Sequence, residues 1–246
     1  MKFLQQIGAY CLLMWRVFRM PDRQRMFWRQ MSLELDKQGT QSVPIDLIIS
    51  VFIGAIMTMQ IKLDMENPLL PRYTVGVVTR DTMLLEFSST ILCLILAGKV
   101  GSNIASEIGT MRITEQIDAL EIMGVNSANY LILPKILAFM AMMPALVILS
   151  VGSALIGGYM MALLTDILTV DEYIFGITYA FMDYHVPYAI AKSVIFAYVI
   201  ASVASYYGYT TRGGALQVGQ ASTNAVVHSS VIILFLDIFL TKLMLS

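Results

Sequence analysis

The chain has 246 residues, of which 57% are hydrophobic and only 13% carry a charge. Soluble domains contain about 25% charged residues, which cover their surface. The composition, with a mean hydropathy of +0.72, excludes a soluble enzyme, a nucleic-acid-binding module and a disordered chain, and it predicts an all-α integral membrane protein with several spans.

Residues 1–43 are predicted to form an amphipathic, interfacial segment. They carry seven Lys/Arg against three Asp/Glu. Apolar side chains recur at spacings of three and four in two pieces, which places each set on one helix face: Ile7, Tyr10, Cys11, Met14 and Phe18, then Phe27, Met31 and Leu35. An ordinary cytoplasmic tail is the alternative.

Residues 44–246 are predicted to form a single transmembrane domain with five helices. The expected spans are about 44–61, 83–105, 131–165, 187–207 and 225–245. The third contains a charge-free run over 136–165, which as one helix would be ~45 Å long, against ~30 Å of hydrocarbon. It is either one long helix, tilted or bent near Pro144, or a hairpin, which would make six spans.

The distribution of cations predicts the orientation, because cytoplasmic loops carry an excess of Lys and Arg. With five spans and the N-terminus inside, eleven cations lie on the inner side and four on the outer side. We therefore expect a multi-pass protein with a cytoplasmic N-terminus and a C-terminus on the outer side.

The sequence contains none of the common catalytic motifs. G-x-x-x-x-G-K-[ST], H-E-x-x-H and G-x-S-x-G are all missing, and the only histidines are His185 and His228. We expect no enzyme activity, no metal and no cofactor in this chain.

Of the charged residues within the expected spans, Glu86, Lys192 and Asp237 are the informative ones. Charges in lipid are costly, so each needs a partner or a purpose. Lys192 and Asp237 lie at similar depths in antiparallel spans, which predicts a structural ion pair, although Lys192 could also extend to the outer surface. Glu86 is either an interfacial carboxylate in outer water or a functional group.

The loop between the second and third spans is predicted to contain a short helix that docks on a cytoplasmic partner. Thr114 is its expected N-cap and Gly124 its end, and Glu115, Asp118 and Glu121 form an acidic stripe. The residues assigned to this coupling helix are Thr114, Glu115, Gln116, Asp118, Ala119, Glu121, Met123 and Gly124.

The chain contains two long, distinctive runs, LAGKVGSNIASEIGTMRITEQIDALEIMGVNSANYLILPKILA and YYGYTTRGGALQVGQASTNAVVHSSVIILFLDIFLTKLML. They resemble the MlaE-type permease family, the membrane subunits of ABC transporters that work on lipids with MCE-domain proteins. The resemblance implies a homodimer in the cell inner membrane, two ATPase subunits on the cytoplasmic side, an MCE-domain protein on the periplasmic side, and a phospholipid substrate. It also implies that the loop helix couples to the ATPase.

The family carries a glutamate in a pattern like RELGP near its lipid cavity. The matching stretch here is LEFSS, residues 85–89, which keeps Glu86 but not the Arg, Gly or Pro. We expect Glu86 and Gln60, near the outer ends of their spans and at similar depth, to meet the headgroup. The apolar wall would come from Phe52, Ile56, Met57 and Met59, since Met adapts to variable acyl chains.

A self-contained secondary carrier or channel is the alternative function. Its coupling ion would use Glu86, Lys192 and Asp237. The loop helix discriminates between the two functions, because a carrier needs no docking element for an ATPase.

Overall fold

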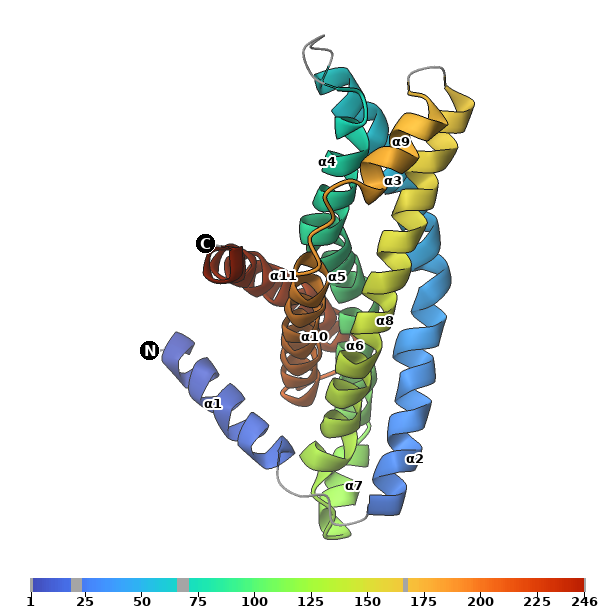
Figure 1. The fold of residues 1–246 in the computed structure, drawn as a ribbon. Coiled ribbons are helices and arrows are strands. Elements are labelled where there is room, and N and C mark those ends of the chain that lie inside the picture. Colours follow the sequence, from blue (N-terminus) through green and yellow to red (C-terminus); the bar gives the residue numbers. More distant parts are fainter. Residues whose placement is uncertain (1, 19–23, 66–70, 166–167, 246) are drawn as a thin grey trace. The chain divides into compact units, whose positions relative to one another are not determined.

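The fold is taken from a computed structural model that describes residues 2–18, 24–65, 71–165 and 168–245. Within these ranges five helical stretches are long and apolar enough to cross a membrane, as the sequence predicts, and no strand is present. They run Met26–Asp64, Thr74–Ile113, Ser127–Leu164, His185–Tyr209 and Ala215–Met244 (Figure 1).

The helices extend beyond the apolar runs that predicted them. The first stretch comprises α2 (Gln24–Glu34), η1 (Leu35–Gly39), η2 (Thr40–Ser42) and α3 (Val43–Asp64), so the second amphipathic piece continues directly into the first span. The second stretch comprises α4 (Thr74–Thr82), η3 (Met83–Ile91), α5 (Leu92–Leu96), η4 (Ala97–Gly101) and α6 (Ser102–Ile113). Of these, η3 and η4 are π-helical, a form often found at functional sites.

The third apolar run forms one helix and not a hairpin. α8 (Ser127–Leu164) has 38 residues and passes through Pro144 without interruption, which gives a length of ~57 Å. The remaining helices are α1 (Lys2–Val17), α7 (Gln116–Ile122), α9 (Val170–Thr178), α10 (His185–Tyr209) and α11 (Ala215–Leu245). The six-span alternative is therefore wrong for the part of the chain described.

The contacts divide the chain into two compact units, each assembled from separate stretches. Unit 1 contains residues 1–41, 94–142 and 194–246, and unit 2 contains residues 42–93 and 143–193. The assignment of 1–43 to an interfacial segment and 44–246 to a single domain stays a prediction.

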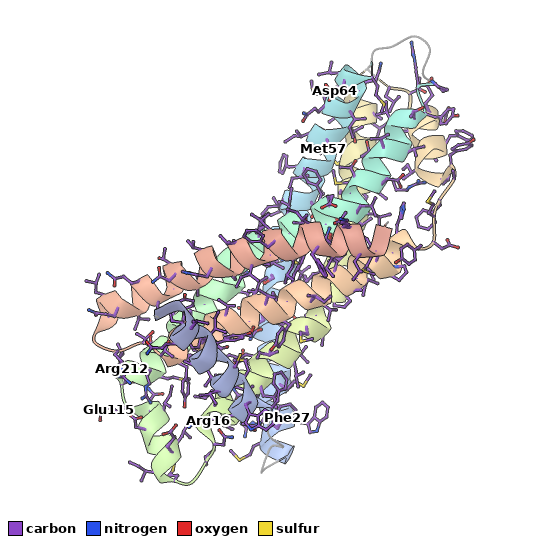
Figure 2. All side chains as sticks on the ribbon, turned by 90° about the vertical axis from the view of Figure 1, so that its left-hand side faces the viewer. Arg16, Phe27, Met57, Asp64, Glu115 and Arg212 are labelled. Carbon is purple, nitrogen blue, oxygen red and sulfur yellow. The ribbon has the colours of Figure 1, made fainter. Side chains whose placement is uncertain are left out.

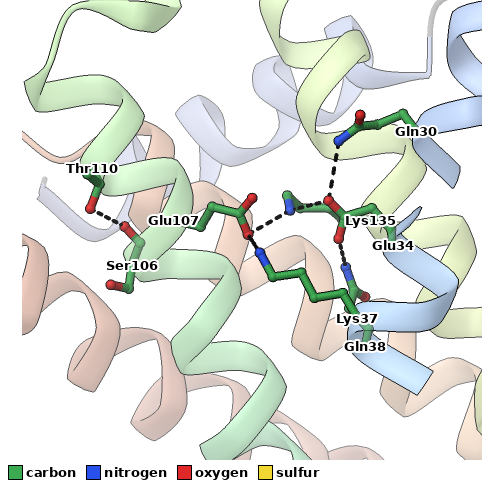
Figure 3. A network of polar contacts seen from close by, with 8 residues as sticks. All are labelled: Gln30, Glu34, Lys37, Gln38, Ser106, Glu107, Thr110 and Lys135. Atoms are coloured by element: carbon green, nitrogen blue, oxygen red, sulfur yellow. Dashed lines mark hydrogen bonds and ion pairs between the residues drawn. The ribbon is translucent and has the colours of Figure 1, made fainter. Parts of the chain in front are cut away.

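In unit 1, a buried network of charges joins α2, η1, α6 and α8 (Figure 3). Lys135 is 1% exposed, and its Nζ lies 2.5 Å from Oε1 of Glu34 and 3.0 Å from Oε2 of Glu107. Lys37 contacts the same Glu107 oxygen at 2.5 Å, and Gln38 donates to Glu34. Each buried charge thus has an opposite partner, which offsets the cost of removing it from water.

Unit 1 also holds α1 and packs α6 beside α11. The side chains of Asn126 and Asn129 donate to the carbonyl groups of Arg16 and Val17, which ties the end of α1 to the start of α8. The hydroxyl of Tyr10 donates to Ser202 on α10 at 2.8 Å. Burial raises the pKa of Tyr10 to about 12. The hydroxyl therefore stays protonated and can donate to Ser202.

In unit 2, glycines bring helix backbones into contact. A Cβ on Gly54 of α3 would overlap the backbone of Ala154 on α8, and one on Gly157 of α8 would overlap the backbone of Val51. Gly76 and Gly176 make a similar close approach between α4 and α9, which lie side by side in Figure 1. Small residues permit such approaches in lipid, where close packing drives helix association.

Candidate functional site

Glu86 lies in the π-helical segment η3 and binds Lys192 of α10. The Nζ of Lys192 is 3.2 Å from Oε2 of Glu86 and donates to the carbonyl group of Leu85 at 3.1 Å. The Lys192 side chain is 0% exposed, whereas that of Glu86 is 42% exposed. The arrangement therefore places a half-buried carboxylate beside a buried ammonium, a pattern suited to holding a polar group.

Sequence reasoning selected both residues but did not pair them. The ion pair expected between Lys192 and Asp237 stays a prediction, whereas the structure shows a pair between Lys192 and Glu86. Glu86 and Lys192 each lie a few residues after the start of their spans, and the second and fourth spans run in the same direction, which was the available signal. The interpretation that Lys192 extends to the surface is wrong, because its side chain is fully buried.

The expected similarity in depth between Gln60 and Glu86 is wrong. Ser50 of α3 and Ser88 of η3 both bond to Ser150, so they lie at the same level. Further along α3, Ile61 packs in a cluster with Val75 of α4. Since α3 and the α4–η3 stretch run antiparallel, Glu86 lies level with Phe52, and Gln60 is eight residues, or ~12 Å, further along the helix.

The expected apolar wall divides between two faces of α3. Phe52, Ile56 and Met59 are 65%, 60% and 41% exposed, and their spacing of four and three residues places them on one face. Met57 packs instead against the buried cluster that contains Ile61 and Tyr173. Figure 2 shows Met57 within the helices of unit 2 and Asp64 at the end of α3. The exposed face is therefore formed by Phe52, Ile56 and Met59 without Met57.

The loop helix is present as α7, but it begins differently from the prediction. Thr114 is not its N-cap. It is the C-cap of α6, and its hydroxyl donates to the carbonyl group of Thr110. Glu115 follows in the left-handed conformation with φ 62° and precedes the first residue of α7. Gly124, with φ +75°, follows α7 and confirms the predicted end.

The acidic stripe of α7 makes contacts within the chain. Asp118 lies 2.6 Å from Nη1 of Arg112. Glu121 accepts hydrogen bonds from Ser127 at 2.8 Å and Tyr209 at 2.9 Å, and these bonds lower the pKa of Glu121. These two carboxylates therefore hold α7 to its neighbours, whatever else they do.

Two large apolar side chains of this loop are exposed. Ile122 is 87% exposed and Met123 is 68% exposed, while Ile117 on the inner face is fully buried. Sequence reasoning included Met123 but missed Ile122, for which the available signal was an apolar pair directly before the terminating Gly124. Arg16, Glu115 and Arg212 lie at one end of unit 1 (Figure 2).

A separate groove of about 1180 Å³ lies between α1 and the loop that follows α7. The groove is lined by Met14 of α1, Phe18 just after α1, Asn126 of the loop, and Tyr198 and Tyr209 of α10. It lies entirely within unit 1, whereas Glu86 and Lys192 belong to unit 2.

Comparison with known proteins identifies the class. A family model described as permease MlaE matches residues 31–243. The probable ABC transporter permease protein slr1045 of Synechocystis sp. is 31% identical, over 98% of this chain and 92% of its own. A probable ABC transporter permease protein of Rickettsia bellii is 29% identical, over 98% and 93% of the two chains.

A plant relative is also similar. The protein TRIGALACTOSYLDIACYLGLYCEROL 1 of Arabidopsis thaliana, a chloroplastic protein, is 31% identical over 89% of this chain and 62% of its own length. Five long apolar helices and matches to permeases over nearly the whole chain define a membrane-spanning permease subunit. The chain belongs to the MlaE permease family.

Proposed function

We propose that this chain is the permease subunit of an ABC transporter that moves phospholipid between the inner membrane and an MCE-domain protein in the periplasm. A separate ATPase on the cytoplasmic side drives the transport, and two copies of the chain form the pathway. The N-terminus is cytoplasmic and the C-terminus periplasmic in this proposal.

The exposed pair Ile122–Met123 on the α7 loop carries the proposal. Two large apolar side chains, 87% and 68% exposed at the tip of a loop fixed by Arg112–Asp118 and by Glu121, suit insertion into a groove of a partner protein. A self-contained carrier needs no such element. The docking role of the acidic residues Glu115, Asp118 and Glu121 is a weaker part of the proposal, because Asp118 and Glu121 have partners within the chain.

A lipid substrate is supported by the α3 face and by Glu86. Phe52, Ile56 and Met59 offer an apolar surface for acyl chains, and Glu86 lies level with Phe52. The Glu86 carboxylate would repel a phosphate, but the neighbouring Lys192 compensates for its charge. The name of the plant relative, which is that of a galactolipid, agrees with a lipid substrate.

Photocrosslinking tests the lipid site. The purified chain is first exchanged into lipid-free detergent. A photoreactive residue at position 52 or 56 should then still capture phospholipid, because a cavity retains its lipid. Position 156 of α8 is the matched control, since Ile156 is 58% exposed and Ile56 is 60% exposed. Equal capture at 52, 56 and 156 would place the cavity elsewhere.

A further inference from the structure

Asp46 of α3 is a carboxylate buried without a cation. It is 1% exposed, and the hydroxyl of Ser50 donates to its Oδ1 at 3.2 Å. Its Oδ2 has no hydrogen-bond partner in the described structure. In the same ranges of the chain, no Lys, Arg or His nitrogen lies within 4.0 Å of the carboxylate.

The surroundings of Asp46 in unit 2 are a chain of buried hydroxyl groups. Ser50 Oγ lies 2.8 Å from Ser150 Oγ, and Ser150 Oγ donates to Ser88 Oγ at 3.3 Å. These serines are 5%, 3% and 1% exposed. The chain joins α3, α8 and η3, and each hydroxyl can both donate and accept.

The charged groups on the same elements do not compensate for Asp46. On η3, Glu86 is engaged with Lys192. On α8, Lys135 is engaged with Glu34 and Glu107 within unit 1. On α3, Lys62 and Asp64 are at least sixteen residues, or ~24 Å, further along the helix. On η4, Lys99 donates to the carbonyl group of Gln41. A negative charge on Asp46 would therefore have no cation within 4.0 Å among the described residues, which makes it costly in a protein interior.

We infer that Asp46, with Ser50, Ser150 and Ser88, forms a proton-binding site that holds a neutral carboxylic acid while α3, α8 and η3 are packed as they are here. The proton occupies Oδ2, and Ser50 continues to donate to Oδ1. Its release requires water or a cation at Asp46, and therefore requires these helices to separate. The site goes beyond the proposed transport of lipid, because any conformational change that opens this packing would release a proton, and closure would bind one.

Infrared difference spectroscopy of the full-length chain in detergent tests the site, because neutral acids and carboxylates absorb in separate regions. At mildly acidic pH, where exposed carboxylates stay ionised, the spectrum of Asp46→Asn minus wild type should show the loss of a neutral-acid carbonyl band. The matched control is Asp64→Asn, the same substitution at an exposed position of the same helix, which should remove carboxylate bands. Loss of carboxylate bands in Asp46→Asn would overturn the inference.

A comparison of two salts and a second variant complete the test. The spectra are recorded in sodium chloride and in choline chloride, and a neutral-acid band that disappears in sodium would show a cation site and contradict a proton site. If Asp46→Asn does not fold, Ser50→Ala replaces it and should shift the acid band to higher frequency by removing a hydrogen bond to Oδ1. Ser89→Ala is the control, because Ser89 is buried nearby but donates to Leu85. An unshifted band in Ser50→Ala would contradict the assignment.

Discussion

Lys192 and Glu86 differ in exposure, and this difference determines what each substitution should do. Glu86→Gln leaves a buried ammonium without its carboxylate, whereas Lys192→Met leaves a carboxylate that is 42% exposed. We expect Glu86→Gln to destabilise the fold by about 1–3 kcal/mol and Lys192→Met by less. The double variant should lose less unfolding free energy than the two single variants lose in sum, which thermal unfolding in detergent would measure. Additive effects would mean that the pair contributes no coupling.

Glu121 should make the stability of unit 1 sensitive to acid. Its hydrogen bonds from Ser127 and Tyr209 lower the pKa of Glu121 below the ordinary value of 4.5. A lowered pKa means that the stabilisation is present above pH 4.5 and is lost as the pH falls through the folded-state pKa. Because Glu121 is exposed, Glu121→Gln should cost only about 0.5–1 kcal/mol at neutral pH. The unfolding curves of the wild type and Glu121→Gln should differ at neutral pH and coincide at acid pH. A difference of the same size at both pH values would contradict this role of Glu121.

At the scale of residues, the sequence predicts which groups matter better than it predicts their partners. Glu86 and Lys192 stand out because charges are rare in apolar spans, but 106 positions separate them. Asp46 lies near the start of its span, where the sequence alone gives no sign of its burial. The hydroxyl groups linked to it, those of Ser50, Ser150 and Ser88, come from three separate elements. Lys135 and Glu34 were not predicted to pair either, because their network combines three distant stretches of chain.

The α7 loop allows a test of partner binding at the scale of elements. Replacing Ile122 and Met123 together with Ser should abolish binding of the ATPase and leave the melting temperature within ~1 °C, since exposed side chains contribute little to the fold. Leu164→Ser, at a 79% exposed position at the end of α8, is the control and should bind normally. Co-precipitation measures the binding. A double variant that retains the ATPase would show that the pair does not dock.

The packing of α3 against α8 depends on single glycines. Gly157→Ala should destabilise unit 2 by about 2–4 kcal/mol, because the new methyl group would overlap the backbone of Val51. Gly152→Ala, five residues earlier in α8, meets nothing within 4 Å and should be neutral or slightly stabilising. Thermal unfolding of both variants measures the difference, and equal melting temperatures would contradict the close approach seen here.

Elements were predictable where a pattern is local. Hydropathy predicts the number and order of the spans, and Gly124 predicts the end of α7. The beginning of α7 was not predictable, because Thr114 has the chemistry of an N-cap but its hydroxyl bonds back to Thr110. The continuation of α2 into α3 was hidden because polar residues of the buried network, including Glu34 and Lys37, interrupt the apolar pattern.

At the scale of the whole molecule, the two units alternate along the chain. α8 contributes its first part to unit 1 and its remainder to unit 2, and the Thr74–Ile113 stretch is divided in the same way. Such a division depends on contacts between distant stretches, which periodicity and composition do not encode. The membrane class and the permease family, by contrast, were predicted from composition and two long runs of sequence, and both are confirmed.

Co-purification from native membranes is the decisive measurement of whether this permease works with a separate ATPase. The full-length chain, tagged and solubilised in mild detergent, should retain an ATP-hydrolysing subunit, and the Ile122→Ser/Met123→Ser variant should lose it. A chain that purifies without any ATPase, and that moves phospholipid or ions across vesicle membranes without ATP, would contradict the account.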